Sequence, residues 1–388
     1  MRQLKYSVLT FVGMLSLPVQ AFAHGTEEEH SSEVLTSSIT YGVWISLAVL
    51  GAFILLFFWS KQKASKLNVK KAEGRAKRDK LAKISKVSLF ISAIAVISTI
   101  GFGIMSANQG SNNEVTFEHI HGLDYKSDGK EIYVPAHDGL RVYKDGEWMI
   151  PERERNDYMG FSMVDDGFYS SGHPGPGSKL ENPLGIVKSK DYGKSIDILG
   201  LYKEEDFHGM TVGYQTKNIY VFNPKPNSKM SEAGFYYSTD DAKTWKKAKF
   251  EGIVDQPSSL AAHPIEKGVV AIGTATGVYI SKDNGNKFEL LMSYDDVTSI
   301  SFTNDNALLA GGGNGKASLA KVDLNTKEQT EIPIPTLEKD SIAYVKQNPV
   351  DKDELVFSTY EKDIYLSKDN GFNWKKIVDK GIALNPTK

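Results

Sequence analysis

The sequence of 388 residues contains no cysteine. A disulfide framework and a thiolate metal site are therefore both excluded. An excess of charge of one sign is also missing, since the formal net charge is −2, and nothing in the composition points to nucleic acid as a partner. Arginine is scarce, and beyond residue 78 it occurs only as Arg141, Arg153 and Arg155. For any metal site, the lack of cysteine leaves imidazole, oxygen and methionine thioether ligands.

Residues 1–23 have the pattern of a secretory signal sequence. A basic start precedes an apolar core from Val8 to Leu17, and Ala21-Phe-Ala23 is a small-x-small cleavage site. An uncleaved anchor is the alternative. Cleavage after Ala23 would leave an acidic segment, 24–38, at the N-terminus. Its first residue, His24, could chelate Cu(II) through its amine and imidazole, and a solvated acidic tail is the plain alternative.

Two later stretches, 39–59 and 87–106, are apolar, and each is about long enough to cross a bilayer. Neither contains Asp, Glu, Lys, Arg or His, so nothing in them indicates a channel or a pump. The loop between them, 60–86, is rich in Lys and Arg and holds only Glu73 and Asp79 as acids. The positive-inside rule places this loop in the cytoplasm. We therefore expect a two-pass protein of the cell membrane whose C-terminal region lies outside the cytoplasm.

The region 107–388 carries a repeat at intervals of roughly 40 to 50 residues. Its frame is Ser-x-Asp-x-Gly followed by an aromatic residue, and it lies between two short β runs. In a hairpin turn the Asp carboxylate can accept turn amides, Gly supplies positive φ, and the aromatic ring can fill space between neighbouring sheets. The residues that carry this structural frame are Asp191, Gly193, Asp240, Trp245, Asp283, Gly285, Asp369, Gly371 and Trp374.

The fullest copy, at 367–374, reads S-x-D-x-G-x-x-W and is similar to the Asp-box (BNR) repeat of β-propellers. That superfamily includes sialidases, sortilin-type receptors, xyloglucanase-type hydrolases, photosystem II assembly-factor propellers and glycosylhydrolase-like membrane-anchored bacterial proteins. The resemblance implies an all-β propeller. It implies little about chemistry, because in those families the repeat is structural and lies away from the active site.

If each copy is the turn between the third and fourth strands of a blade, the sequence predicts a six-bladed propeller. A seventh blade assembled from both termini is the alternative. We expect the ring to close by pairing Val115–Phe117 with Ile382–Leu384, because an open end would leave an unpaired edge. Up-and-down connectivity puts the repeat turns on one face. The entries to first strands and the ends of second strands lie on the other.

Most histidines of the propeller fall on the face opposite the repeat turns, and His263 is the exception. They lie at entries to first strands or at ends of second strands, and they are His119, His121, His137, His173 and His208. Neutral imidazoles suit Cu(II) or Zn(II), and Asp138 or Asp206 could ligate the ion or orient a ring. Met159, Met163 and Met210 lie close in sequence, and their thioethers would favour copper. The alternative is that these histidines are hydrogen-bonding plugs at blade ends or contacts to an organic ligand.

A glycoside hydrolase is the alternative function. Sialidase-type catalysis grips its substrate with arginines from separate blades, whereas the arginines here all lie in the first blade or its exit, and lysine cannot replace a bidentate clamp. Xyloglucanase-type enzymes place two acids between two propellers, and this chain has one propeller. Glycoside hydrolysis needs two carboxylates set across a cleft. The residues that could supply them are Asp138, Asp157, Asp206 and Glu205.

A binding module is the third possibility. Sortilin-type propellers bind peptides and assembly-factor propellers bind a client membrane protein, and a two-span tether suits a partner at the membrane. Tyr158, Phe161 and Phe207 near the histidines are candidates for stacking on a peptide or glycan. Altogether the residues favour a membrane-anchored extracytoplasmic propeller that binds a ligand, a client protein or a metal ion through its histidine-rich rim, rather than an enzyme.

Overall fold

The computed structural model describes residues 29–68, 70–110 and 115–385. The chain divides into two compact units, Met1–Asn113 and Glu114–Lys388. The predicted signal sequence, 1–23, and His24 lie outside the described residues.

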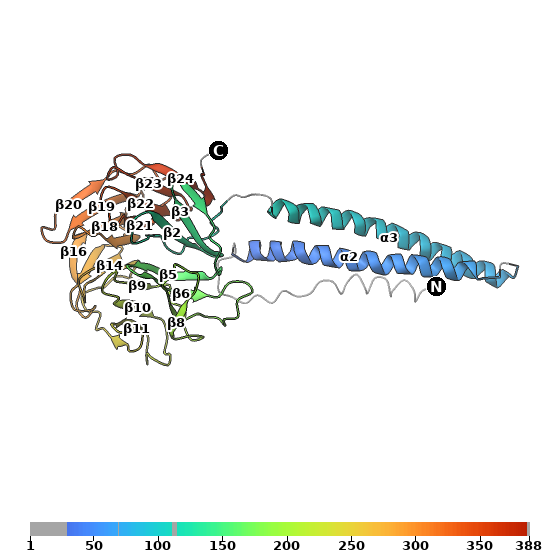
Figure 1. Ribbon diagram of the computed structural model, residues 1–388, viewed down its shortest axis with the longest axis horizontal. Helices are drawn as coiled ribbons and strands as arrows, with labels where there is room; N and C mark the ends of the chain where they lie inside the picture. The colour runs from blue at the N-terminus through green and yellow to red at the C-terminus, as the bar shows by residue number, and fades with distance from the viewer. Residues whose placement is uncertain (1–28, 69, 111–114, 386–388) are drawn as a thin grey trace. The chain divides into compact units, whose positions relative to one another are not determined.

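The first unit contains α2 (Glu29–Ser65) and α3 (Ala72–Gly110), which run side by side (Figure 1). Both helices are long and apolar enough to cross a membrane. α2 begins well before the predicted span 39–59, and α3 begins inside the predicted loop 60–86. The early start of α3 follows from the sequence of Ala72 to Ile84, which is rich in Ala, Lys and Arg, all good helix formers.

The helix pair is apolar outside and carries small polar residues between its helices. Trp44, Phe90 and Ile97 are exposed, whereas Ser46 is buried. Across the pair, Thr99 Oγ1 donates a hydrogen bond to Ser46 Oγ at 2.9 Å. In membranes, small residues allow close helix approach and their hydroxyls bond across the interface. The two helices therefore have the surface of a hairpin that can span a membrane.

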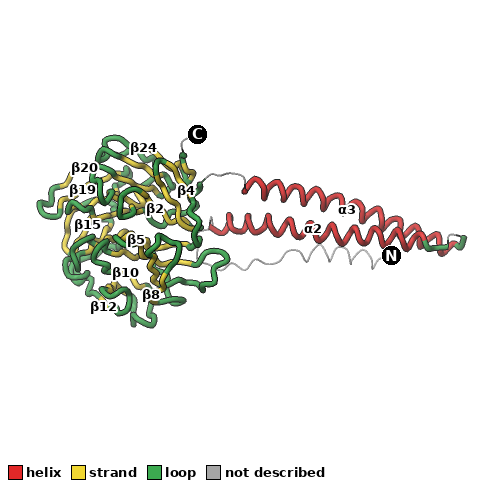
Figure 2. The backbone as a smooth tube through the Cα atoms, viewed as in Figure 1, coloured by secondary structure: helices red, strands yellow, loops and turns green. Residues whose placement is uncertain are grey.

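The second unit consists of strands joined by loops and turns (Figure 2). Its sheets are formed by strands that follow one another in the sequence and pair antiparallel. Blade one comprises β1 (Asp124–Tyr125), β2 (Glu131–Ala136), β3 (Gly139–Lys144) and β4 (Glu147–Met149). Blade two comprises β5 (Asp157–Val164), β6 (Gly167–His173), β7 (Ile186–Ser189) and β8 (Asp197–Gly200). Blade three comprises β9 (Met210–Val212), β10 (Ile219–Asn223), β11 (Gly234–Ser238) and β12 (Lys246–Lys247).

The remaining blades repeat this pattern, and the last one has an additional strand. Blade four comprises β13 (Ser259–Ala262), β14 (Val270–Thr274), β15 (Gly277–Ser281) and β16 (Glu289–Ser293). Blade five comprises β17 (Ser299–Phe302), β18 (Ala307–Gly312), β19 (Ser318–Asp323) and β20 (Gln329–Ile332). Blade six comprises β21 (Ile342–Gln347), β22 (Leu355–Thr359), β23 (Ile364–Ser367), β24 (Lys375–Asp379) and β25 (Ile382–Ala383).

These six sheets form a closed ring. Their first strands contact one another in the order β1, β5, β9, β13, β17, β21, and β21 contacts β1 again. In Figure 1, outer strands such as β16 and β20 lie at the periphery of the ring. The prediction of an all-β six-bladed propeller preceded by two apolar helices is confirmed, and the described residues form no seventh blade.

Side chains that alternate along each strand fill the spaces between neighbouring blades. On β2, Tyr133 packs toward blade two, whereas Ile132 and Val134 pack toward blade six. On β10, Tyr220 packs toward blade four and Val221 toward blade two. Successive side chains along a strand point to opposite faces of the blade. Because neighbouring blades cover both faces, both faces are apolar.

The ring closes where the sequence predicts. Thr116 bridges Ile382, the Phe117 amide donates to Gly381 O at 2.8 Å, and the Ala383 amide donates to Val115 O at 2.9 Å. The chain segment that enters the propeller therefore pairs with its last strand, and the edge of blade six is covered.

The turn of the repeat is held by its own side chains. In the copy that begins at Ser281, the serine Oγ donates to Asp283 Oδ1 at 2.7 Å and accepts the Gly285 amide at 2.9 Å. Asp283 Oδ1 also accepts the Lys287 amide at 3.0 Å. The same bonds occur in the copies that begin at Ser189, Ser238 and Ser367. These turns therefore satisfy their polar groups locally.

The glycine position of the frame has a left-handed backbone in every one of these copies. φ is +93° at Gly193, +84° at Gly285 and +89° at Gly371, and Ala242 takes the same place with φ +61°. A Cβ atom on Gly285 would lie 2.4 Å from Cε1 of Phe235 in the preceding blade. Glycine is thus required there for both its backbone and its lack of a side chain.

Candidate metal centre

Side chains from the first three blades form two sets, each with two imidazoles and one carboxylate whose ligand atoms lie within 4.8 Å of one another. We name His121, His137 and Asp157 the inner set. We name His173, Asp206 and His208 the outer set.

Strand ends position both sets. In the inner set, His121 precedes β1, His137 follows β2, and Asp157 is the first residue of β5. In the outer set, His173 is the last residue of β6, and the other two members precede β9. Neighbouring strands of a blade are antiparallel, so first-strand starts and second-strand ends lie at the same end of the sheet.

Asp157 is the centre of the inner set. Its Oδ2 lies 2.9 Å from His137 Nδ1, and its Oδ1 lies 3.5 Å from His121 Nε2. Asp157 Oδ1 and His121 Nε2 are both buried without a hydrogen-bond partner. Buried polar atoms in native proteins are almost always hydrogen-bonded, so these two atoms are suited to share a bound cation.

His119 borders the inner set. Its ring centroid lies 6.0 Å from that of His121, nearly parallel to it, and 6.0 Å from that of His137, edge-on. Burial lowers the pKa of His121, and the charges of neighbouring imidazoles lower it further, while Asp157 opposes them. The lowered pKa favours the neutral form of His121, which is the form that ligates metal ions.

The outer set is a hydrogen-bonded cluster around Asp206. Its Oδ2 lies 3.1 Å from His173 Nε2 and 2.9 Å from His208 Nε2. The hydrogen bond to Asp206 raises the pKa of His173 to about 9, and the same kind of bond raises the pKa of His208. Burial by itself raises the pKa of Asp206, but the hydrogen bonds from both imidazoles bring it far below its usual range. A metal ion that binds here must displace protons from these rings.

Asn182 completes the surroundings of the outer set. Its Oδ1 lies 2.6 Å from His173 Nδ1, and it belongs to the long connection between β6 and β7. An acceptor on this nitrogen fixes the ring orientation and directs Nε2 toward Asp206.

The two sets meet across one strand pair. Asp157 of the inner set and His173 of the outer set are direct partners in the register of β5 and β6. Side chains of such partners lie on the same face of the sheet, with Cβ atoms about 4.5–5.5 Å apart. Gly172 allows the close approach, because a Cβ there would lie 2.0 Å from Asp157 O and its φ is +118°. The inner and outer sets are therefore adjacent.

Asp138, a predicted ligand or orienting group, lies with arginines instead of imidazoles. It forms an ion pair with Arg141, and its Oδ2 lies 3.8 Å from Arg155 Nη1. Arg141 is almost fully buried, and its Nε donates to Thr116 O at 2.8 Å. A buried guanidinium requires a counter-charge, and this need accounts for the position of Asp138.

Other candidates near the rim belong to the hydrophobic core. Tyr158 and Phe161 pack between blades one and two, and Phe207 packs between blades two and three. The prediction that these rings stack on a ligand is wrong, because all three are buried. Met163 and Met210 are buried in the same two core clusters, and their thioethers contribute packing.

His263 lies apart from both sets, although its Nε2 is buried without a hydrogen-bond partner as well. Its Nδ1 accepts the amides of Ile265 and Glu266 at 3.2 and 2.9 Å, and its ring packs against Phe302 at 4.9 Å between centroids. Burial lowers its pKa. It is a structural histidine that caps a turn.

Asp157 is the functional candidate that the sequence signals less directly. It stands among the carboxylates available to a hydrolase, but not among the predicted ligands. Its signal is its place at the start of a first strand, the position that His121 and His208 occupy near the starts of the neighbouring blades. A comparison of equivalent positions in adjacent blades would have found it.

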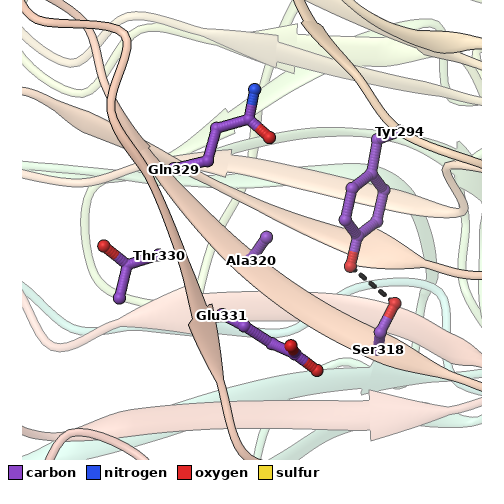
Figure 3. A pocket seen from close by; sticks show the side chains of 6 residues that line it. All are labelled: Tyr294, Ser318, Ala320, Gln329, Thr330 and Glu331. Atoms are coloured by element: carbon purple, nitrogen blue, oxygen red, sulfur yellow. Dashed lines mark hydrogen bonds between the residues drawn. The ribbon is translucent and has the colours of Figure 1, made fainter.

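A hollow of different character lies at the outer strands of blade five. Tyr294, Ser318, Ala320, Gln329, Thr330 and Glu331 line it, as Figure 3 shows. Tyr294 Oη and Ser318 Oγ are 2.7 Å apart. Its lining holds no imidazole and a single carboxylate, so it lacks the paired groups that the histidine sets provide.

No family model matches the sequence, and no curated protein matches it. Among solved structures, a GH74 enzyme of Niastella koreensis shows 14% identity with a TM-score of 0.46, over 68% of this chain and 45% of that one. YCF48 bound to D1 peptide shows 15% identity with a TM-score of 0.40, over 71% and 89%. YCF48 from Cyanidioschyzon merolae shows 12% identity with a TM-score of 0.36, over 58% and 86%. This chain thus spans less than half of the GH74 enzyme, and likenesses at this level do not bear on activity.

Proposed function

We propose that this protein is a membrane-anchored, extracytoplasmic propeller that binds a divalent transition metal ion, Cu(II) or Zn(II), at its histidine rim. The observation that carries the proposal is the pair of buried atoms without hydrogen bonds, Asp157 Oδ1 and His121 Nε2, which lie 3.5 Å apart. Leaving buried polar groups unpaired costs stability, and a shared metal ion would satisfy both.

The separation of these two atoms fits a shared ion. Zinc lies about 2.0–2.2 Å from imidazole nitrogen and carboxylate oxygen, which puts two ligand atoms of a tetrahedral ion about 3.3 Å apart. Two imidazoles and one carboxylate form a donor set that Cu(II), Zn(II) and Fe(II) accept. Of the metals to test, copper should bind most tightly, because the Irving–Williams order places it at the maximum.

The membrane topology is part of the same proposal. Two apolar helices can span a bilayer, and the basic residues between them favour a cytoplasmic position for the loop. The propeller then lies outside the cytoplasm. No cysteine is present to compete for the ion, so imidazole and carboxylate are the available ligands.

A glycoside hydrolase has less support. A retaining or inverting mechanism needs one carboxyl group that is protonated near neutral pH. The pKa of Asp206 is held far below its usual range, Asp138 neutralises arginines, and Asp157 lies between two imidazoles. The Glu205 carboxylate has a lysine partner, with Lys225 Nζ 3.6 Å from its Oε2.

The test is the metal content of the full chain purified in detergent. After incubation with Cu(II) or Zn(II) and removal of free ions, elemental mass spectrometry should find retained metal. Asp157→Asn should weaken metal binding by more than about 100-fold, because it removes a ligand and the group that orients His137. A wild-type chain that folds but retains no metal would refute the proposal.

Asp165→Asn is the matched control. Asp165 follows β5 at its opposite end, so this change removes the same charge from the same hairpin without touching either set. A His24→Ala variant removes the predicted N-terminal Cu(II) chelate. Metal retention equal to that of the wild type is expected in both variants.

A further inference from the structure

The side chains of the inner and outer sets differ in their exposure to solvent. This difference suits the two sets to different steps, the retention and the capture of a metal ion. Side-chain exposure is 68% for His208, 36% for His173 and 15% for Asp206. In the inner set it is 33% for His137, 17% for His121 and 6% for Asp157. The most exposed ligand of either set is therefore His208 of the outer set, and the most buried is Asp157 of the inner set.

The outer set is suited to capture an ion and to release it. His208 is largely exposed and forms a hydrogen bond with Asp206, so its ring can turn toward an incoming ion that takes the place of the proton in that bond. Asp206 Oδ1 is buried without a hydrogen-bond partner and offers a second oxygen to that ion. Because water reaches this set, ligand exchange there is easier than at a buried site.

The inner set is suited to retain an ion. The carboxylate of Asp157 is buried, the His121 amide is fixed by Pro135 O at 3.0 Å, and the ring of His119 lies against two of the set's imidazoles. Ligands held in place before the ion arrives bind it more tightly, because little ordering remains to be done. Burial also strengthens the attraction between the ion and the carboxylate.

The strand pair supplies the connection between the sets. Asp157 and His173 are register partners on β5 and β6, so an inner ligand and an outer ligand are neighbours. An ion can then change ligands one at a time without returning to solvent.

We infer that the outer set is the entry site for the ion that the inner set retains, with transfer between His173 and Asp157. This inference rests on the proposed metal-binding function and deepens it. The protein would load and release an exchangeable ion, and would not merely carry a structural one.

The experiment follows Co(II) loading of the full chain in detergent by stopped-flow visible absorption, and Co(II) release into excess chelator. In His208→Ala both rates should fall by about 10-fold or more. The affinity of the retained ion should change by less than about twofold, since an entry route alters both rates by the same factor and leaves their ratio unchanged. Asp165→Asn should load and release at wild-type rates.

The outcomes separate this inference from the proposed function. If His208→Ala loads at the wild-type rate while Asp157→Asn loses the ion, the entry site is refuted and metal binding stands. If His208→Ala changes the affinity as much as the loading rate, His208 is an ordinary ligand and the entry role is likewise refuted. If the wild-type chain binds no Co(II) and also retains no Cu(II) or Zn(II) in the elemental analysis, the proposed function itself fails. Asp206→Asn should give the same paired slowing as His208→Ala and provides a second test.

Discussion

The two faces of the propeller treat polar side chains in opposite ways. On the face of the repeat turns, Ser281 and Asp283 satisfy each other and the turn amides, and the same bonds recur in other blades. On the histidine face, Asp157 and Asp206 each keep a buried oxygen without a hydrogen bond, and each lies beside two imidazoles. Repeated turns with locally satisfied polar groups are typical of structure, whereas a carboxylate with an unsatisfied oxygen beside two imidazoles indicates a site.

The largest expected effect is the loss of stability caused by a substitution on the face of the repeat turns. Gly285→Ala should destabilise the propeller by about 3 kcal/mol, since alanine in a left-handed conformation costs roughly 1–2 kcal/mol and its Cβ would collide with Phe235. Ala242→Gly is the matched control. It relieves a left-handed alanine but removes a buried methyl group, and we expect a change within about 1 kcal/mol. Urea unfolding followed by tryptophan fluorescence measures both.

Equal effects of Gly285→Ala and Ala242→Gly would show that the glycine position is not a conformational requirement. Neither substitution should alter metal retention, because both lie on the face opposite the histidine sets. A loss of metal in folded Gly285→Ala protein would contradict the separation of the two faces.

The next effect is the stabilisation of the folded chain by a metal ion bound at the histidine face. An ion that binds only the folded chain stabilises it by about 2.7 kcal/mol at a free concentration 100 times its dissociation constant. Zn(II) should therefore raise the unfolding temperature of the wild type and leave that of Asp157→Asn unchanged. Differential scanning fluorimetry with and without a chelator checks this, with Asp165→Asn as the responsive control.

The smallest effect concerns acid stability of the repeat turns. The amide and hydroxyl of Ser195 lower the pKa of Asp191 to about 2, and the hydroxyl and amide of Thr244 do the same for Asp240. Because the pKa is lower in the folded state, the stabilisation is complete above the unfolded value of 3.8 and is lost as the pH falls toward 2. Asp191→Asn/Asp240→Asn should lose less stability than the wild type between pH 5 and pH 2.

Urea unfolding midpoints at several pH values in this range provide the measurement for the turn carboxylates. Since both carboxylates are exposed, solvent screens them and the difference should be modest. Parallel pH curves for the wild type and the double variant would show that these turns do not contribute to acid sensitivity.

Much of the propeller could be predicted from local sequence. The repeat turn is held by residues within a few positions of one another, so its signature survives in the sequence of Ser281 to Phe288. Up-and-down connectivity placed the ends of second strands beside the histidines, and β2 ends at Ala136, next to His137. The closing pair was also predictable, because a ring with an uncovered edge is unfavourable.

The partners within the histidine face could not be predicted in the same way. Asp138 follows His137 directly in the sequence, yet it pairs with Arg141, while His137 meets Asp157 from the next blade. The aromatic residues near the rim are equally ambiguous in sequence, since Tyr158 and Phe207 suit either a stacking surface or a core and the packing of neighbouring blades buries them.

The sequence by itself therefore determined the propeller architecture, the closing segments, the two apolar helices and the face on which each strand end lies, while the structure decided for six blades over seven. These features depend on local turn chemistry, on periodicity and on the hydrophobic length of a helix. Only the tertiary structure decided which carboxylate lies against which imidazole. Such contacts join residues of different blades, and they depend on the distances between sheets and on competition for buried counter-charges, which no spacing along the chain records.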